Sequence, residues 1–118
     1  MTKQTIDFFI HDSEIISVIE DTKNNTIDFI LNYQVDWDNN VFAKKILRFY
    51  NCLNYTVKEI PFASRPQILD FKDFGEVSYS IGEGRNEIYI KRRKIELITN
   101  AGTRILEYEK LELIDKNE

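Results

Sequence analysis

The amino-acid sequence predicts a mostly β protein: an antiparallel β-sandwich or a partly open barrel of about seven strands, with room for one short helix. Hydrophobic residues alternate with polar ones along most of the chain, which is the period of a half-buried strand. Short polar segments separate these runs, as the turns of antiparallel hairpins do. A length of 118 residues and a hydrophobic content of 42% suit one ordinary core. Residues 1–118 are therefore expected to form a single β-rich domain.

The clearest strand predictions fall within residues 14–36. Residues 14–20 form the first expected strand, and the polar run 21–25 is a turn in which asparagine tolerates the left-handed backbone conformation. Residues 26–36 alternate most cleanly, and the side chains expected to face the core are Ile27, Phe29, Leu31, Tyr33 and Val35. The opposite face is polar except for Ile30, so it should meet water, as one face of an antiparallel sheet does.

The pattern in the middle of the chain predicts shorter strands, and it does not decide between helix and strand for one segment. The expected strands are 41–50, 55–60 and 77–81. Pro61 and Pro66 bracket an irregular stretch, because neither residue can donate to a strand ladder. Residues 67–74 fit two structures. Ser64 could cap a short helix with Pro66 in its first turn, whereas weak alternation of the same residues fits a strand.

The last two strands are expected over residues 87–99 and 103–114. A three-residue loop joins them, and its final glycine fits a type I turn followed by a left-handed residue. This loop would place Thr99 opposite Thr103 in the ladder. The two strands would then form the terminal hairpin of the domain.

A β-bulge is predicted near Arg92 in the first of these two strands. The apolar positions change from even numbers, Ile88 and Ile90, to odd numbers, Ile95 and Leu97, within one strand. One extra residue would account for the change and would oppose apolar to apolar and basic to acidic side chains. The pairs expected beyond the bulge are Ile90 with Leu111, Ile88 with Leu113 and Arg92 with Glu109.

Composition favours a cytoplasmic protein without a membrane segment. The apolar stretch at residues 8–10 is too short for a secretory signal, and no run approaches the length of a membrane helix. The single cysteine, Cys52, fits a reducing compartment. Residues 1–40 carry eight acidic and two basic residues, a net charge of −6, against −4 for the whole chain. Such an asymmetry can mark a surface that meets a partner.

No arrangement of residues predicts an enzyme. Cys52 would need a neighbouring base to act as a nucleophile, and the single histidine, His11, lies far from it in the sequence. His11 and Asp12 form a doublet of the kind that metal-dependent phosphohydrolases use, but no second histidine completes a metal site, and Asp12 suits a turn. Residues 36–40 lack the glycine and glutamate positions of a calcium loop. We expect no catalytic residue, metal or cofactor.

The basic run 91–94 does not predict nucleic-acid binding. On a strand its four side chains divide between two faces. Four glutamates of the same expected hairpin lie near enough to neutralise them: Glu87, Glu96, Glu107 and Glu109. The chain as a whole is acidic, whereas nucleic-acid-binding domains present a basic stripe or patch. We therefore expect a protein partner rather than a nucleic acid.

The residues His11–Ile16, then 27–33 and Trp37, resemble a group of small uncharacterised bacterial β-rich domains. Some members of that group are similar to immunity proteins of polymorphic toxin systems. The resemblance implies a stand-alone cytoplasmic binding protein and supplies no catalytic residues. Immunity proteins that neutralise basic nucleases are often acidic, because opposite electrostatic fields speed association.

We therefore predict a non-enzymatic protein-binding domain, immunity-like, that docks its partner through an acidic face. The docking residues lie on the polar side of strand 26–36 and in the loop after it: Asp28, Asn32, Gln34, Asp36, Trp37 and Asp38. Trp37 could equally belong to the core.

Two alternative functions stay open. One is a small-ligand binder that uses a barrel mouth or a sandwich cleft lined by tyrosine and phenylalanine. The other is a structural module that assembles with itself, for example as a homodimer, through an exposed strand edge such as residues 26–36. An apolar cavity would favour the first, and a dimer through a sheet edge would favour the second.

Overall fold

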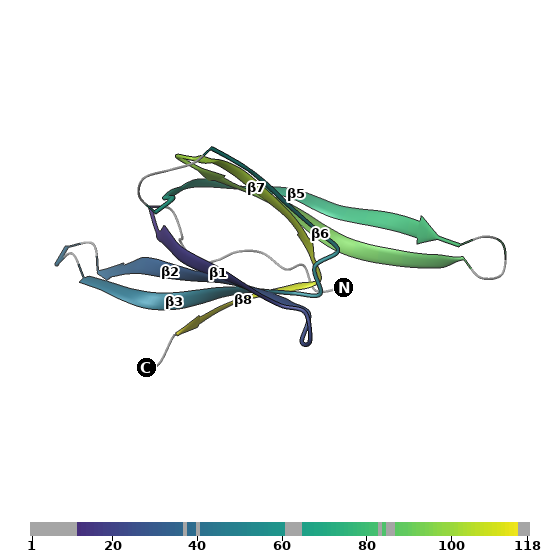
Figure 1. Cartoon of the computed structure of the whole chain (residues 1–118), viewed down its shortest axis with the longest axis horizontal. Coiled ribbons are helices and arrows are strands. Elements are labelled where there is room, and N and C mark those ends of the chain that lie inside the picture. Colours follow the sequence, from purple (N-terminus) through teal and green to yellow (C-terminus); the bar gives the residue numbers. More distant parts are fainter. Residues whose placement is uncertain are drawn as a thin grey trace.

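The structure, a computed structural model of the chain, describes residues 12–36, 38–39, 41–60, 65–82, 84 and 87–115, without the side chains of 34–36. Eight strands form two four-stranded antiparallel sheets (Figure 1). The mostly β, antiparallel fold class is thereby confirmed, and the strands belong to two sheets rather than to one closed barrel. Within the described ranges no helix is long and apolar enough to cross a membrane.

The two sheets are built from different parts of the chain. In spatial order, the first sheet contains β1 (Glu14–Asp21), β2 (Thr26–Asp36), β3 (Val41–Tyr50) and β8 (Lys110–Asp115). The second sheet contains β4 (Asn54–Glu59), β7 (Gly102–Tyr108), β6 (Ile88–Thr99) and β5 (Ile68–Ile81). The chain therefore changes sheets after β3 and again after β7.

Backbone hydrogen bonds join the two sheets at the corner where β1 and β5 begin. The N–H of Ile68 donates to the carbonyl of Ser13, and the N–H of Ile15 donates to the carbonyl of Pro66, both over 2.8 Å. These bonds satisfy backbone groups where the strands end and hold the sheets in a fixed relation.

The core lies between the sheets and is made of the alternating residues that each strand points inward. Phe49 contacts Phe29 of its own sheet and Tyr108 of the opposite sheet, with ring centroids 5.5 Å and 5.2 Å apart and edges turned to faces. The buried aliphatic members are Ile15, Ile27, Leu31, Leu47, Ile68, Ile95, Leu97, Leu106 and Leu111. One continuous apolar layer thus spans both sheets.

β2 confirms the face that its alternation predicts. The residues on its core side are buried: Ile27, Phe29 and Leu31, with Tyr33 partly buried against them. The side chain of Val35 lies outside the described set. β2 is also an inner strand, paired with β1 on one side and β3 on the other. The predicted self-assembly edge at residues 26–36 is therefore wrong for residues 26–32, where β1 and β3 occupy both edges of the strand.

The turn between β1 and β2 forms as its asparagines predict. Asn25 has a φ of 54°, the left-handed conformation that asparagine tolerates better than most residues. The Asp21 carboxylate accepts hydrogen bonds from the N–H groups of Lys23 and Asn24 over 3.0 and 3.2 Å. These contacts satisfy turn backbone that has no strand partner.

The C-terminal region forms two strands in different sheets, where the sequence predicts one strand over residues 103–114. β7 ends at Tyr108 in the second sheet, and β8 begins at Lys110 beside β3 in the first. The N–H of Glu109 donates to the carbonyl of Tyr50 over 2.9 Å at the crossing. The pairs predicted between residues 88–92 and the C-terminal strand are wrong for this reason. The core-facing positions change from even numbers, Leu106 and Tyr108, to odd numbers, Leu111 and Leu113, at this crossing. Two consecutive polar residues, Glu109 and Lys110, mark the change in the sequence.

The predicted bulge near Arg92 is also wrong. β6 pairs with β5 without a break through residues 88–99. The extra residues lie on β5 instead, at Leu69 and Phe74, and Gly75 follows the second with a φ of 83°. The change of apolar parity along β6 therefore has another cause. Ile95 and Leu97 point into the core, whereas Ile88 and Ile90 lie beyond it and point to the opposite side of the same strand.

The connection between β6 and β7 is one residue shorter than predicted. Thr99 pairs with Gly102, so only residues 100–101 lie outside the ladder and the register differs by one from the prediction. A Cβ atom on Gly102 would lie 2.1 Å from the carbonyl oxygen of Lys58. Glycine is needed here because β4 passes against it.

β5 decides between the two structures that residues 67–74 left open. Residues 68–81 form one strand of 14 residues, so the short helix is wrong. Ile68 is fully buried, and the strand takes its ladder hydrogen bonds from β6. A single helical turn is costly to nucleate and offers no such partner. Ser64, the predicted cap, lies outside the described residues.

β5 and β6 extend past the other strands as a two-stranded arm (Figure 1). We define the arm as residues 77–81 of β5 and 88–92 of β6, because the ladder between β6 and β7 ends at Arg93. The molecule measures 58 Å along its longest axis and 32 and 27 Å along the others. The arm lies along that longest axis, outside the sandwich body.

Candidate protein-binding surfaces

Asp28, the first of the predicted docking residues, lies on the outer face of the first sheet and already has a partner. Nε and Nη2 of Arg48 donate to its two carboxylate oxygens over 2.7 and 2.8 Å. Only 14% of the Asp28 side chain and 32% of the Arg48 side chain are exposed. The bonded carboxylate raises the pKa of Arg48. Asp28 therefore meets a base of its own sheet.

The other predicted docking residues are placed unevenly. Asn32 lies on β2 and its amide donates to the carboxylate of Glu14 over 3.3 Å. Asp38 is exposed in the turn after β2. Gln34 and Asp36 lie on β2, but their side chains are outside the part of the chain that the structure describes. Trp37 lies wholly outside that part. The structure therefore brings Asp28 and Asn32 to one face.

The outer face of the first sheet is striped. Two rows of cross-strand neighbours run across it, one charged (Asp28, Arg48, Glu112) and one apolar (Ile30, Ile46, Ile114). Tyr50 donates to Glu112 beside the charged row. Ile30, which interrupts the polar pattern of its strand, is only 6% exposed. The pair of Asp28 with Arg48 thus neutralises part of the negative charge of the N-terminal region on this face.

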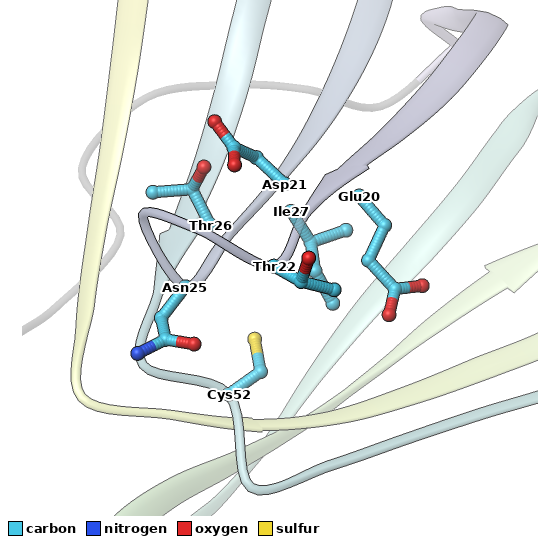
Figure 2. A pocket seen from close by; sticks show the side chains of 7 residues that line it. All are labelled: Glu20, Asp21, Thr22, Asn25, Thr26, Ile27 and Cys52. Atoms are coloured by element: carbon cyan, nitrogen blue, oxygen red, sulfur yellow. The ribbon is translucent and has the colours of Figure 1, made fainter.

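A small cleft lies where the β1–β2 turn meets Cys52. It has a volume of about 80 Å³ and is lined by Glu20, Asp21, Thr22, Asn25, Thr26, Ile27 and Cys52. Figure 2 shows the thiol pointing toward the turn. Ligand pockets are usually several times larger, at roughly 300–1,000 Å³. This cleft is therefore too small for a drug-sized ligand.

The environment of Cys52 holds its thiol in the neutral form. Burial raises the pKa of the thiol to about 12, and the nearby charge of Arg92 lowers it only in part. A nucleophilic cysteine needs a lowered pKa, because the thiolate is the reactive form. In the described ranges, no group of three or more His, Cys, Asp or Glu side chains is placed to hold a metal.

A polar cluster on β4 and β7 of the second sheet lies against the first sheet. Nε and Nη2 of Arg104 donate to the Glu59 carboxylate over 2.6 and 2.7 Å, and Nη1 donates to the Tyr55 hydroxyl over 2.9 Å. The guanidinium carbon lies 5.7 Å from the ring of Phe29 in the opposite sheet. Only 14% of the Arg104 side chain and 10% of the Glu59 side chain are exposed. These contacts are internal, so the cluster has a structural role.

The arm presents one apolar face and one polar face. Alternation and the β5–β6 register place five apolar or aromatic residues on the same side: Val77, Tyr79, Ile81, Ile88 and Ile90. Arg92, opposite Val77, lies on this side at the base of the arm. The other side carries Ser78, Ser80, Tyr89 and Lys91. We call the first side the apolar arm face. Ile81 and Ile88 are opposite each other and are 51% and 61% exposed.

Hydrogen bonds tie the base of the arm to the sandwich body. The hydroxyl of Tyr79 donates to Oε1 of Glu107 over 2.6 Å, and the amide of Asn54 donates to the same oxygen over 2.8 Å. Glu107 is only 5% exposed, and its bond raises the pKa of Tyr79. Nε of Arg92 donates to the carbonyl of Asn51 over 2.8 Å. The arm is therefore held in one orientation.

Sequence reasoning missed the arm, although two signals for it are present. Ile88 and Ile90 have the opposite parity to the core residues Ile95 and Leu97, and the explanation is that the two pairs face opposite sides of an unbroken strand. Residues 77–81 also contain no charge, in a chain of which 31% of residues are charged. A strand that points its apolar residues away from the core is a candidate for a contact outside its own domain.

Comparisons with known proteins place the chain in no family. No family description matches the sequence, and no curated protein shows significant similarity to it. The resemblance to immunity proteins therefore rests on the residues quoted for it and stays a prediction.

Proposed function

We propose that this chain is a non-enzymatic protein-binding domain whose contact surface is the apolar arm face. The observation that carries the proposal is the pair Ile81 and Ile88, both more than half exposed on a ribbon that projects from the body. Exposed apolar area is unfavourable in water. Contiguous apolar patches rimmed by polar residues typically mark protein contacts.

The way the arm is held supports a role in binding. A two-stranded ribbon is marginally stable by itself, yet Tyr79 and Arg92 hydrogen-bond this ribbon to the body. A surface held in place before contact loses less conformational entropy on binding. The domain therefore offers a preorganised apolar ribbon to its partner.

The non-enzymatic and cytoplasmic parts of the proposal rest on Cys52. Its raised thiol pKa is the opposite of what nucleophilic catalysis needs. A single free cysteine, partly buried, suits a reducing compartment. In the immunity-like form of this proposal the partner is a toxin protein, and the turn that carries Asp38 is the competing contact surface.

The test is capture of partner proteins from the native cell by three variants of the full chain. Ile88→Lys places a charge on the apolar arm face. Tyr89→Lys is its matched control, because the next residue points to the other face and is 69% exposed, against 61% for Ile88. Asp36→Lys combined with Asp38→Lys reverses the charge of the predicted acidic surface.

We expect the same stoichiometric partner on the natural chain and on Tyr89→Lys, and its loss from Ile88→Lys. Loss from the Asp36/Asp38 variant alone would move the contact to the β2–β3 turn and contradict the arm proposal. Equal retention by all three variants would also contradict it. Circular dichroism of each variant shows whether the sandwich remains folded.

A further inference from the structure

We propose that two copies of this chain pair through the free edge of β5 in the arm, antiparallel and centred on Tyr79. The inference goes beyond the proposed function, because the pairing uses the edge of β5 and leaves the apolar arm face free to contact another protein. The symmetry of the arm sequence carries it.

The first step is that β5 is an edge strand, and that its arm segment lacks the features that usually prevent pairing with another chain. Within the described residues it pairs with β6 on one side. On its other side, the backbone contacts are with residues 12–14 and occur only where the strand begins, at Gln67 and Ile68. Natural proteins protect such edges with charges, prolines or bulges, because unpaired N–H and C=O groups invite another strand. Residues 77–81 contain no charge and no proline, and both bulges of β5 lie before them.

The second step is that this edge is complementary to itself. The sequence Val-Ser-Tyr-Ser-Ile is symmetric in character about its central residue. An antiparallel pairing centred on Tyr79 places Val77 opposite Ile81 of the other copy and Ser78 opposite its Ser80. Apolar residues then meet apolar residues, hydroxyls meet hydroxyls, and no like charges are opposed.

The register is specific as well as complementary. A slip of one residue would place the apolar arm face of one copy beside the polar face of the other. A slip of two residues in either direction shortens the overlap of the uncharged segments. The two-fold arrangement uses the same patch on both copies, which is the geometry of the commonest protein dimers.

The third step is what the pairing gains. It joins two ribbons of two strands into one sheet of four, with strand order β6, β5, β5 and β6. Three or more strands with an apolar face reach a stability that a lone hairpin lacks. The apolar arm faces of both copies then form one continuous surface. Edge pairing over five residues covers less than the roughly 1,200 Å² of a stable interface, so the dimer is weak and depends on protein concentration.

The test measures the oligomeric state of the full chain by sedimentation velocity across a wide range of concentrations. Ser78→Lys with Ser80→Lys puts lysine opposite lysine twice in the proposed register. Ser78→Lys with Ser80→Glu puts lysine opposite glutamate twice at the same positions, and it is the matched control. Both substituted side chains are exposed and project away from the apolar arm face.

We expect a monomer–dimer equilibrium for the natural chain, weakened in the Lys/Lys variant and restored in the Lys/Glu variant. The difference between the two variants should reach about tenfold in the dissociation constant, given the usual strength of opposed charge pairs. A dimer that both variants retain equally would show that another surface pairs, and would overturn the inference.

A chain that stays monomeric at every concentration would also overturn the inference. The capture experiment with Ile88→Lys and Tyr89→Lys would still report on the arm as a surface for a different protein. Loss of the captured partner from Ile88→Lys, together with a monomeric chain, would thus uphold the proposed function and reject self-pairing. A monomeric chain together with equal capture by Ile88→Lys and Tyr89→Lys would reject both self-pairing and the proposed function.

Discussion

The sandwich body buries its apolar side chains and the arm exposes them, although β5 and β6 run through both. In the body, Ile95 and Leu97 of β6 are fully buried between two sheets. In the arm, Ile88 of the same strand is 61% exposed. The body therefore owes its stability to apolar burial, whereas the arm depends on one ladder and on polar ties at its base. The difference shows that one strand can fill the core at one end and present apolar residues to solvent at the other.

The largest expected effect contrasts a core ring with an arm residue. Phe49→Ala should lower the free energy of unfolding by about 3–5 kcal/mol, because it empties a site at which two other rings meet. Ile88→Ala should change it by less than about 0.5 kcal/mol, as exposed substitutions usually do. Urea unfolding of both variants measures the two values. Similar losses would mean that the arm belongs to the folded core.

The second prediction contrasts two ion pairs at different depths. Arg104→Ala should cost about 3 kcal/mol, because it leaves the carboxylate of Glu59 buried without its partner. Arg93→Ala, which breaks the pair with Asp73 near the base of the arm, should cost less than about 1 kcal/mol. Urea midpoints of the two variants give the comparison. An equal cost would contradict the internal position of the Arg104 cluster.

The third prediction concerns a buried hydroxyl in the body. The hydroxyl of Tyr108 has no hydrogen-bond partner among the described residues, and burial raises its pKa to about 12. Tyr108→Phe should therefore raise the free energy of unfolding by about 1 kcal/mol at neutral pH, since it removes an unsatisfied polar group and keeps the ring. Thermal unfolding at pH 7 measures the gain, and a loss of stability would indicate a partner for this hydroxyl.

The pH dependence of the same variant sharpens the prediction. The unfolded chain releases the Tyr108 proton near pH 10, whereas the folded chain keeps it until about pH 12. The contribution to stability is therefore complete below pH 10 and is lost as pH rises toward 12. Tyr108→Phe should show a shallower alkaline loss than the natural chain. Cys52 adds its own loss from about pH 9 to 12, so Cys52→Ser is the control for that part.

The smallest expected effect tests how the arm is held. Tyr79→Phe removes the bond to Glu107 but keeps the aromatic ring. Amide hydrogen exchange in residues 77–81 and 88–92 should become several-fold faster, while exchange in the body stays unchanged. Ser80→Ala, on the opposite face of the arm, is the control. Unchanged exchange in Tyr79→Phe would show that the β5–β6 ladder alone orients the arm.

Part of the fold follows from patterns that lie close together in the sequence. The core face of β2 and the β1–β2 turn are predicted correctly, since each depends on alternation or on residues within one turn. The helix at residues 67–74, the bulge near Arg92 and the single C-terminal strand are wrong. Each of these depends on which distant strand supplies the ladder, and β5, β6 and β8 find partners that local pattern does not name.

The candidate site was harder to predict than the fold. The acidic residues of the N-terminal region suggested a docking face, but Asp28 meets Arg48 only because β2 and β3 lie side by side. The apolar residues Ile88 and Ile90 were expected to pair with the C-terminal strand, because the sequence does not show where that ladder ends. Exposure is a property of the assembled molecule, whereas alternation is a property of the chain.

Side-chain period and turn chemistry act over a few residues, so the order of amino acids is enough to predict the class of the fold, the inward face of β2 and the β1–β2 turn. The folded molecule was needed to show that β7 and β8 belong to different sheets, that Asp28 is paired with Arg48, and that β5 and β6 run past the body. Strand pairing is a contact between distant segments, so its partners are chosen by the packing of the whole chain.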